Sequence, residues 1–190
     1  MDILKERIRR EGQNLGNGIL KIDTFLNHQV DSSLLEEVGE EIAWRFASVS
    51  PTRILTAEVS GIIPAVMTGK ALGNVPVVYA RKRKPITMVE PVYLEIAPSH
   101  TKGHEVILMV SPEFLMPGDR VLIVDDFLAS GKTIDALARI VASAGATLVG
   151  IATVVEKEFE NGREFLTSWG VPIESLVTII NMSGNTIEIR

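Results

Sequence analysis

The segment VLIVDDFLASGKT, residues 121–133, decides the fold of this chain. It begins with four apolar residues and continues with two adjacent carboxylates, Asp125 and Asp126. A run of small residues around Gly131 then leads into apolar residues at helical spacing. An uninterrupted apolar run is typical of a strand that is buried on both faces of a parallel sheet. The order of strand, acidic pair, glycine loop and helix therefore predicts an α/β fold whose ligand lies outside the carboxyl ends of the strands.

The glycine loop, residues 129–133, has the composition of an anion site. A loop that enters a helix leaves backbone N–H groups unpaired, and Gly131 lets a ligand approach that backbone closely. Ser130 and Thr133 add hydroxyls, and Lys132 adds a positive charge. Hydrogen bonds to a charged group contribute about 1.5–3 kcal/mol each, whereas the helix dipole contributes only about 0.3–1 kcal/mol. The amides and hydroxyls, from Ala129 to Thr133, are thus expected to bind a phosphate dianion.

The acidic pair indicates a different ligand group. Asp125 and Asp126 would repel a phosphate, but their oxygens accept hydrogen bonds from sugar hydroxyls or from water on Mg²⁺. The loop resembles the end of a Walker A motif, which requires a glycine five residues before Gly131. Asp126 occupies that position, so the spacing argues against a nucleoside triphosphatase.

Composition limits the remaining possibilities. The chain has 190 residues, which suits one domain, and its net charge of −5 argues against nucleic acid as the main partner. It contains no cysteine, and no apolar run reaches the roughly 18 residues that a membrane span needs. The first ten residues, MDILKERIRR, lack the apolar core of a signal peptide. We therefore expect a cytoplasmic protein without a membrane partner.

Apolar periodicity predicts five core strands, at residues 53–59, 75–80, 121–124, 148–155 and 173–180. Helices are expected at residues 2–10, after a cap at Asp31 or Ser33, after Gly61 and after Gly131, with weak helical character at 159–169. Residues 89–97 and 105–110 are expected to pair as a ribbon with its tip at 99–103. The prediction is a single domain with a core at about 45–160, covered by a hood from about 1–44 and 161–190.

The 121–133 motif resembles the phosphoribosyl-pyrophosphate (PRPP) motif of type I phosphoribosyltransferases. The resemblance implies that family's fold, in which helices flank a central, mostly parallel five-stranded sheet beneath a small hood. It implies that Asp125 and Asp126 hold the ribose hydroxyls and that residues 129–133 hold the 5-phosphate. It also assigns the turn at Ser60 and Gly61 to pyrophosphate. Arg81, and with it Lys82, follows the second strand and is expected to recognise the same group.

Two further segments, 19–31 and 155–159, are candidates for the site of the base. With these two segments included, the chain resembles xanthine-using members of the family in the order of its motifs. These motifs are FLNHQ, SGIIPAVMTG, YARK, VLIVDDFLASG and VVEKEF. The implied purine contacts are Leu20, Asn27 and Lys157. The chemistry agrees, because Lys157 can only donate hydrogen bonds and so suits an oxo group rather than the amino group of adenine. Phe159 is expected either to stack on the purine or to close the core.

The resemblance implies a purine-salvage enzyme that converts xanthine and PRPP to xanthosine 5′-monophosphate and diphosphate. Mg²⁺ is expected to arrive with PRPP or diphosphate rather than at a dedicated metal site, and a homodimer is implied. The tip at residues 99–102 resembles the mobile loop that closes over the site in this family. Two alternatives remain open: the same reaction on hypoxanthine, guanine or adenine, and a PRPP-sensing regulator without catalysis.

Overall fold

The structure is a computed structural model that describes residues 1–98, 105–184 and 186–190. The predicted tip of the ribbon lies outside the described residues. The helices and strands are α1 (Asp2–Glu11), β1 (Gln13–Asn14), β2 (Leu20–Lys21), η1 (Asp23–Asn27), α2 (Ser32–Phe46), η2 (Ala47–Val49), β3 (Arg53–Ala57), α3 (Ile62–Ala71), β4 (Val77–Ala80), β5 (Tyr93–Pro98), β6 (Glu105–Val110), β7 (Arg120–Leu128), α4 (Lys132–Ser143), β8 (Thr147–Lys157), η3 (Glu158–Glu160), α5 (Gly162–Leu166), η4 (Thr167–Trp169), β9 (Ile173–Asn181) and β10 (Glu188–Ile189).

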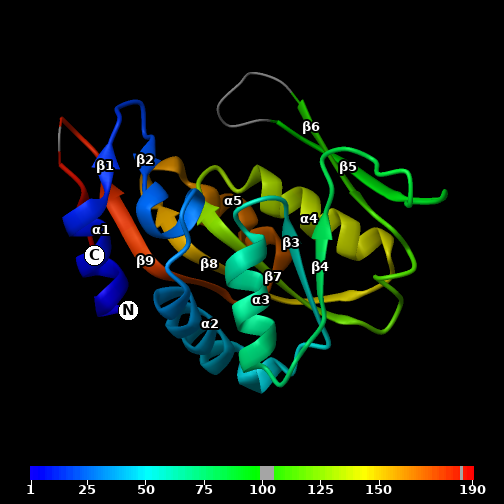
Figure 1. Cartoon of the computed structure of the whole chain (residues 1–190). Helices are drawn as coiled ribbons and strands as arrows, with labels where there is room; N and C mark the ends of the chain where they lie inside the picture. Colours follow the sequence, from blue (N-terminus) through cyan, green and yellow to red (C-terminus); the bar gives the residue numbers. More distant parts are fainter. Residues whose placement is uncertain (99–104, 185) are drawn as a thin grey trace.

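The central sheet has the strand order β10-β9-β8-β7-β3-β4 (Figure 1). The five expected strands, β3, β4, β7, β8 and β9, pair in parallel, which confirms the predicted α/β class. The sheet has a sixth strand as well, because β10 pairs antiparallel with β9 and extends that edge. β9 belongs to the central sheet and α2 packs against α3, although both elements fall within the ranges expected for the hood.

Alternating side chains of β7 fill two separate cores. Val121 and Ile123 pack into the core that contains the buried face of α4. Leu122 and Val124 pack into the core that contains the buried faces of α2 and α3. Because successive side chains of a strand point to opposite faces, the four apolar residues of 121–124 can serve both cores at once. The result is a three-layer domain, with α2 and α3 on one face of the sheet and α4 on the other (Figure 1).

The pairing of β7 with its two neighbours ends at different heights. Its ladder with β3 runs from Arg53↔Val121 to Leu55↔Ile123 and stops there. Its ladder with β8 continues to Leu128↔Glu156. The strand therefore extends past the acidic pair, rather than ending before it as the sequence suggested. Beyond Ile123, β3 and β7 no longer hydrogen-bond to each other, and this opens the sheet at the acidic pair.

Two smaller antiparallel units lie outside the central sheet. β1 and β2 form a short hairpin of the N-terminal segment, and η1, a π-helical turn, follows it. β5 and β6 form the expected ribbon, which begins at Tyr93 rather than at residue 89. An isolated bridge between Arg81 and Met109 joins this ribbon to the end of β4. No helix of the described residues is long and apolar enough to cross a membrane.

The cap of α2 decides between the two residues that the sequence left open. Asp31 is the N-cap, and its Oδ1 accepts a hydrogen bond from the Leu34 amide at 3.2 Å. Ser33 lies inside the first turn and is not the cap. Asp31 is favoured because its carboxylate also pairs with Arg7 of α1 at 3.0 Å. The cap therefore ties α1 to α2 as well.

Close contact between α2 and α3 depends on Gly39. A Cβ at this position would lie 2.5 Å from the Met67 carbonyl carbon and 2.7 Å from its oxygen. These are backbone atoms, so they cannot rotate away. Alanine would gain about 1 kcal/mol in helix propensity, but overpacking of this kind costs about 1–3 kcal/mol. The steric cost is therefore expected to exceed the gain.

We predict that Gly39→Ala lowers the free energy of unfolding by up to about 2 kcal/mol, because the helices must move apart. Thermal and urea denaturation measure the change. Glu40→Ala, on the exposed side of the same helix, is the matched control and should stay within about 0.5 kcal/mol of the parent. Equal or higher stability of Gly39→Ala would contradict the account of this contact.

Candidate functional site

A cavity of about 320 Å³ lies where β3 and β7 separate. Eleven of the thirteen residues predicted for the site line it, and they come from the hood, β7, the glycine loop, β8 and the turn after β3. These residues are Leu20, Ser60, Gly61, Asp125, Asp126, Ala129, Ser130, Gly131, Lys132, Thr133 and Lys157. The cavity is lined in addition by Lys82 and Phe127.

The acidic pair occupies the floor of this cavity. Asp125 is 7% exposed, and its Oδ1 accepts a hydrogen bond from the Asp126 amide at 3.0 Å. Burial raises the pKa of Asp125 well above its usual range, and the negative charge of Asp126 raises it further. A buried carboxylate beside a second carboxylate costs stability, and such an arrangement is typical of a site that serves a ligand.

The turn after β3 packs directly on the acidic pair. A Cβ at Gly61 would collide with Asp125 Oδ1 and with Thr56 Oγ1. Glycine is therefore needed here for close approach, and it brings the open turn next to the carboxylate. Ser60 and Gly61 both line the cavity, as the sequence predicted. The turn and the acidic pair consequently form one continuous surface.

Arg81 and Lys82 take different positions at the end of β4. Arg81 pairs with Glu58 at 2.7 Å and lies over the Tyr79 ring, and it lines a neighbouring cavity rather than this one. The Lys82 amide donates to Glu58 Oε1 at 2.6 Å, and the Lys82 side chain lines the site. The structure therefore brings Lys82 to the cavity and holds Arg81 on Glu58.

The glycine loop forms the opposite end of the cavity and leads into α4. Gly131 has φ +77° and is the N-cap residue of α4, so the loop needs glycine for its backbone conformation. Gly162 of α5 packs against this loop. A Cβ there would collide with the Ala129 carbonyl oxygen and lie 2.8 Å from the Gly131 nitrogen. No pattern in the sequence indicates this contact, because it joins two glycines that lie 31 positions apart.

The hood reaches the acidic pair through Asn27. Its Nδ2 donates to Asp126 Oδ2 at 2.7 Å, which links η1 to β7. Asn27 is not among the residues that line the cavity, whereas Leu20 of β2 is. The expected purine contacts thus enter from two parts of the hood, and one of them is already engaged with a carboxylate.

Lys157 at the end of β8 is buried beside the hood. It is 8% exposed, and its Nζ donates to the Gly18 carbonyl at 2.6 Å. Glu160 pairs with it at 3.5 Å, and the Phe127 ring centre lies 5.3 Å from Nζ. A buried ammonium with these partners is held in a defined place. Phe127 lines the cavity and Phe159 is not among the lining residues, so the aromatic wall of the cavity comes from β7.

Within residues 1–98, 105–184 and 186–190, no group of three His, Cys, Asp or Glu side chains could hold a metal ion. Glu58 and the two carboxylates of the acidic pair are the acidic side chains that line the cavity.

Comparison with known proteins gives consistent results. Residues 29–164 match the phosphoribosyl transferase domain family. The chain is 48% identical to xanthine phosphoribosyltransferase of Moorella thermoacetica, over 99% of this chain and 95% of that protein. It is 49% identical to xanthine phosphoribosyltransferase of Deinococcus deserti, over 100% and 98%. A crystal structure of adenine phosphoribosyltransferase from Thermoanaerobacter pseudethanolicus matches with a TM-score of 0.74 and 25% identity, over 92% and 99%.

The raised pKa of Asp125 predicts how Asp125→Asn will behave. When folding raises the pKa of a carboxyl group, the folded protein is destabilised as the pH rises. The loss begins near the pKa of the group in the unfolded chain, about 3.9, and is complete above its pKa in the folded protein. The amide can still accept the bond from Asp126 but carries no charge. The melting temperature of Asp125→Asn, relative to the parent, should therefore increase with pH in scans from about pH 3 to pH 8.

Asp119→Asn is the opposite control. Burial favours the neutral form of Asp119, but hydrogen bonds from Met116 and the charge of Arg53 outweigh it, so its pKa is lowered. The relative melting temperature of Asp119→Asn should therefore fall as the pH rises through about 4. The account of Asp125 would be wrong if its variant showed a constant difference or the same slope as Asp119→Asn.

Proposed function

The chain belongs to the phosphoribosyltransferase family, and we propose that it converts xanthine and PRPP to xanthosine 5′-monophosphate and diphosphate in purine salvage. Its full-length relatives at 44–49% identity are xanthine phosphoribosyltransferases. One observation carries the proposal. A single cavity contains the acidic pair, the glycine loop and a buried lysine, and these are the groups needed for the ribose, the 5-phosphate and an oxo-purine.

The geometry supports a division of the cavity among the parts of PRPP. The glycine loop, residues 129–133, would hold the 5-phosphate with amides and hydroxyls at the start of α4. Asp125 and Asp126 would accept hydrogen bonds from the two ribose hydroxyls, and this binding would replace the solvation that burial removes. Ser60, Gly61 and Lys82 lie together and would bind the diphosphate. Arg81 could join them once its pairing with Glu58 is released.

In the reaction, a ring nitrogen of xanthine forms a bond to ribose C1 while the bond from C1 to diphosphate breaks. The N–H proton of xanthine leaves, and diphosphate takes the bonding electrons. The chain contributes by positioning the two reactants and by stabilising the charge that develops on diphosphate. Phosphoribosyltransferases generally use Mg²⁺ with PRPP, and we infer that the ion enters on PRPP as part of the substrate, since the acidic pair alone would supply few ligands.

The preference for xanthine rests on Lys157. Its ammonium group only donates hydrogen bonds, so it suits an oxo group of the purine and leaves the amino group of adenine without an acceptor. A site built on matched polar groups rejects an unmatched analogue by about 10⁴-fold. Solved adenine enzymes share the fold at about 25% identity, so the base, rather than the fold, separates the two activities.

The decisive measurement is a purine panel with PRPP and Mg²⁺, in which the nucleotide product is detected for xanthine, hypoxanthine, guanine and adenine. We expect xanthine to give the highest kcat/KM. Lys157→Ala should raise the apparent KM for xanthine roughly 10- to 100-fold, since it removes a charged hydrogen bond of about 1.5–3 kcal/mol, and should change the KM for PRPP much less.

Lys82→Ala is the matched control, because it removes a second cavity lysine on the diphosphate side. It should raise the KM for PRPP more than the KM for xanthine. Adenine as the preferred base would contradict the assignment of Lys157, as would equal effects of Lys157→Ala on both substrates.

We also infer a homodimer, supported by an exposed apolar surface on the ribbon. Leu94, Ile96 and Ile107 are half-exposed on one face of β5 and β6. The opposite face packs against α4, where Glu95 pairs with Arg139 at 2.8 Å. A ribbon with apolar side chains on both faces indicates a second contact surface. The cytoplasmic location remains a prediction.

Ile107→Lys should shift the protein from dimer to monomer in sedimentation velocity, because it places a charge in the proposed apolar contact. Val66→Lys, which changes an exposed apolar residue on α3, is the control and should leave the dimer intact. A parent protein that sediments as a monomer at micromolar concentration would refute the proposal.

A further inference from the structure

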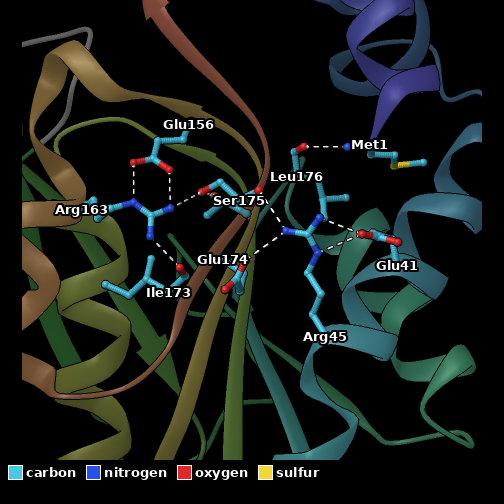
Figure 2. A network of polar contacts seen from close by, with 10 residues as sticks. Met1, Glu41, Arg45, Glu156, Arg163, Ile173, Glu174, Ser175 and Leu176 are labelled. Carbon is cyan, nitrogen blue, oxygen red and sulfur yellow. Dashed lines mark hydrogen bonds and ion pairs between the residues drawn. The ribbon is translucent and has the colours of Figure 1, made fainter. Parts of the chain in front are cut away.

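The segment that follows the base-site lysine is closed by an ion pair between a buried glutamate and a partly exposed arginine. Arg163 of α5 reaches back seven residues to Glu156 of β8 (Figure 2). Its Nε donates to Glu156 Oε1 at 2.8 Å and its Nη2 donates to Oε2 at 2.5 Å. Each guanidinium edge atom thus meets its own carboxylate oxygen, which is the two-pronged geometry that lysine cannot reproduce. We call this pair the clasp.

The clasp is fixed to the sheet on both sides. Glu156 is 2% exposed and pairs in register with Leu128, the residue before the glycine loop. Arg163 Nη1 donates to the Ile173 carbonyl at 2.6 Å, where β9 begins, and Nη2 reaches Ser175 Oγ at 3.3 Å. Burial alone would raise the pKa of Glu156, but the hydrogen bonds from Arg163 and Ser175 outweigh it and lower that pKa. The pair is therefore charged and held in place.

The residues between the two members of the clasp contact both halves of the site. Lys157 follows Glu156 directly and faces the cavity. Glu160, which pairs with Lys157, lies three residues further on. Gly162 immediately precedes Arg163 and packs against the backbone of the glycine loop. A second ion pair, between Arg190 and Glu158, also reaches this segment. Its two side chains are more exposed than those of the clasp, so it is expected to contribute little to stability.

From this arrangement we propose that Arg163 and Glu156 are positioning residues, which set the base-site lysine and the phosphate-binding loop in register with each other. The inference rests on the proposed function, because it takes its two ligand groups from there. Neither member of the clasp lines the cavity. They act through Lys157 at one end of the segment and through Gly162 at the other. A displacement of about 1 Å at such a distance from the chemistry can cost on the order of 10²-fold in rate.

Arg45 provides a matched control within the same view (Figure 2). It also forms a fork on a carboxylate, since its Nε and Nη2 donate to Glu41 Oε1 at 3.0 and 2.7 Å. It is also attached to β9, through Glu174 at 3.0 Å and the Ser175 carbonyl at 3.4 Å. It stands on α2 and contacts neither end of the clasp segment. Loss of Arg45 should therefore affect stability alone.

The test compares Arg163→Ala with Arg45→Ala in the full-length protein. Calorimetry gives the Kd for ribose 5-phosphate, steady-state kinetics give the KM for xanthine, and thermal scans give the melting temperature. We expect Arg163→Ala to raise both the Kd and the KM by about tenfold or more. Arg45→Ala should lower the melting temperature and change both constants less than about twofold. Arg163→Lys, which keeps the charge but loses the fork, should recover only part of the affinity.

Gly162→Ala separates the two ends of the segment. It should weaken ribose 5-phosphate binding through the collision with the loop, with a smaller effect on the KM for xanthine. If Arg163→Ala fails to fold, Glu156→Gln takes its place, because it keeps the volume and removes the charge. Equal effects of the clasp variant and Arg45→Ala on the two constants would overturn the inference alone. A parent protein that binds neither ribose 5-phosphate nor PRPP would overturn the proposed function and the inference with it.

Discussion

The separation of β3 from β7 after Ile123 is the constraint on which the rest of this structure depends. Below that point the two strands are held by backbone hydrogen bonds, and above it the sheet must be completed by other groups. Asp125 lies at the opening, buried and with its pKa raised. The turn at Gly61 can approach only because it has no side chain there. The polar site therefore lies where two neighbouring parallel strands stop hydrogen-bonding to each other.

Much of the fold and of the site could be predicted because the relevant signals are local. The buried run at 121–124, the acidic pair and the glycine loop lie within thirteen consecutive residues, and each has its own chemical reason. Strand ends were less predictable. β7 continues past Asp125 because β8 goes on pairing with it, and such pairing between distant strands leaves no mark in the sequence of either one. The pairing of β10 with β9 is another contact that lies outside the five-stranded sheet of the prediction.

Several contacts between segments that are distant in sequence escaped the prediction. Arg81 was expected in the site because it follows β4, yet it lies against Glu58, a residue that comes from another strand end. Gly162 supports the glycine loop through a backbone contact that no side-chain pattern can reveal. The choice of Asp31 over Ser33 as the cap of α2 likewise depended on Arg7, a partner in a different helix. Spatial partners decided each of these cases.

Polar contacts within the protein hold the side chains around the cavity in place. Asp126 is held by Asn27, Lys157 by Gly18 and Glu160, and Arg81 by Glu58. In each case a group expected to touch a ligand already has a protein partner. Such partners lower the cost of leaving polar groups buried and unpaired. Because of these partners, ligand binding must replace hydrogen bonds within the protein by hydrogen bonds to the ligand. Affinity therefore depends on the difference in free energy between these two sets of hydrogen bonds. Residues that fix the framework, such as Gly61, Gly162 and the Glu156–Arg163 pair, can therefore influence binding without touching a ligand.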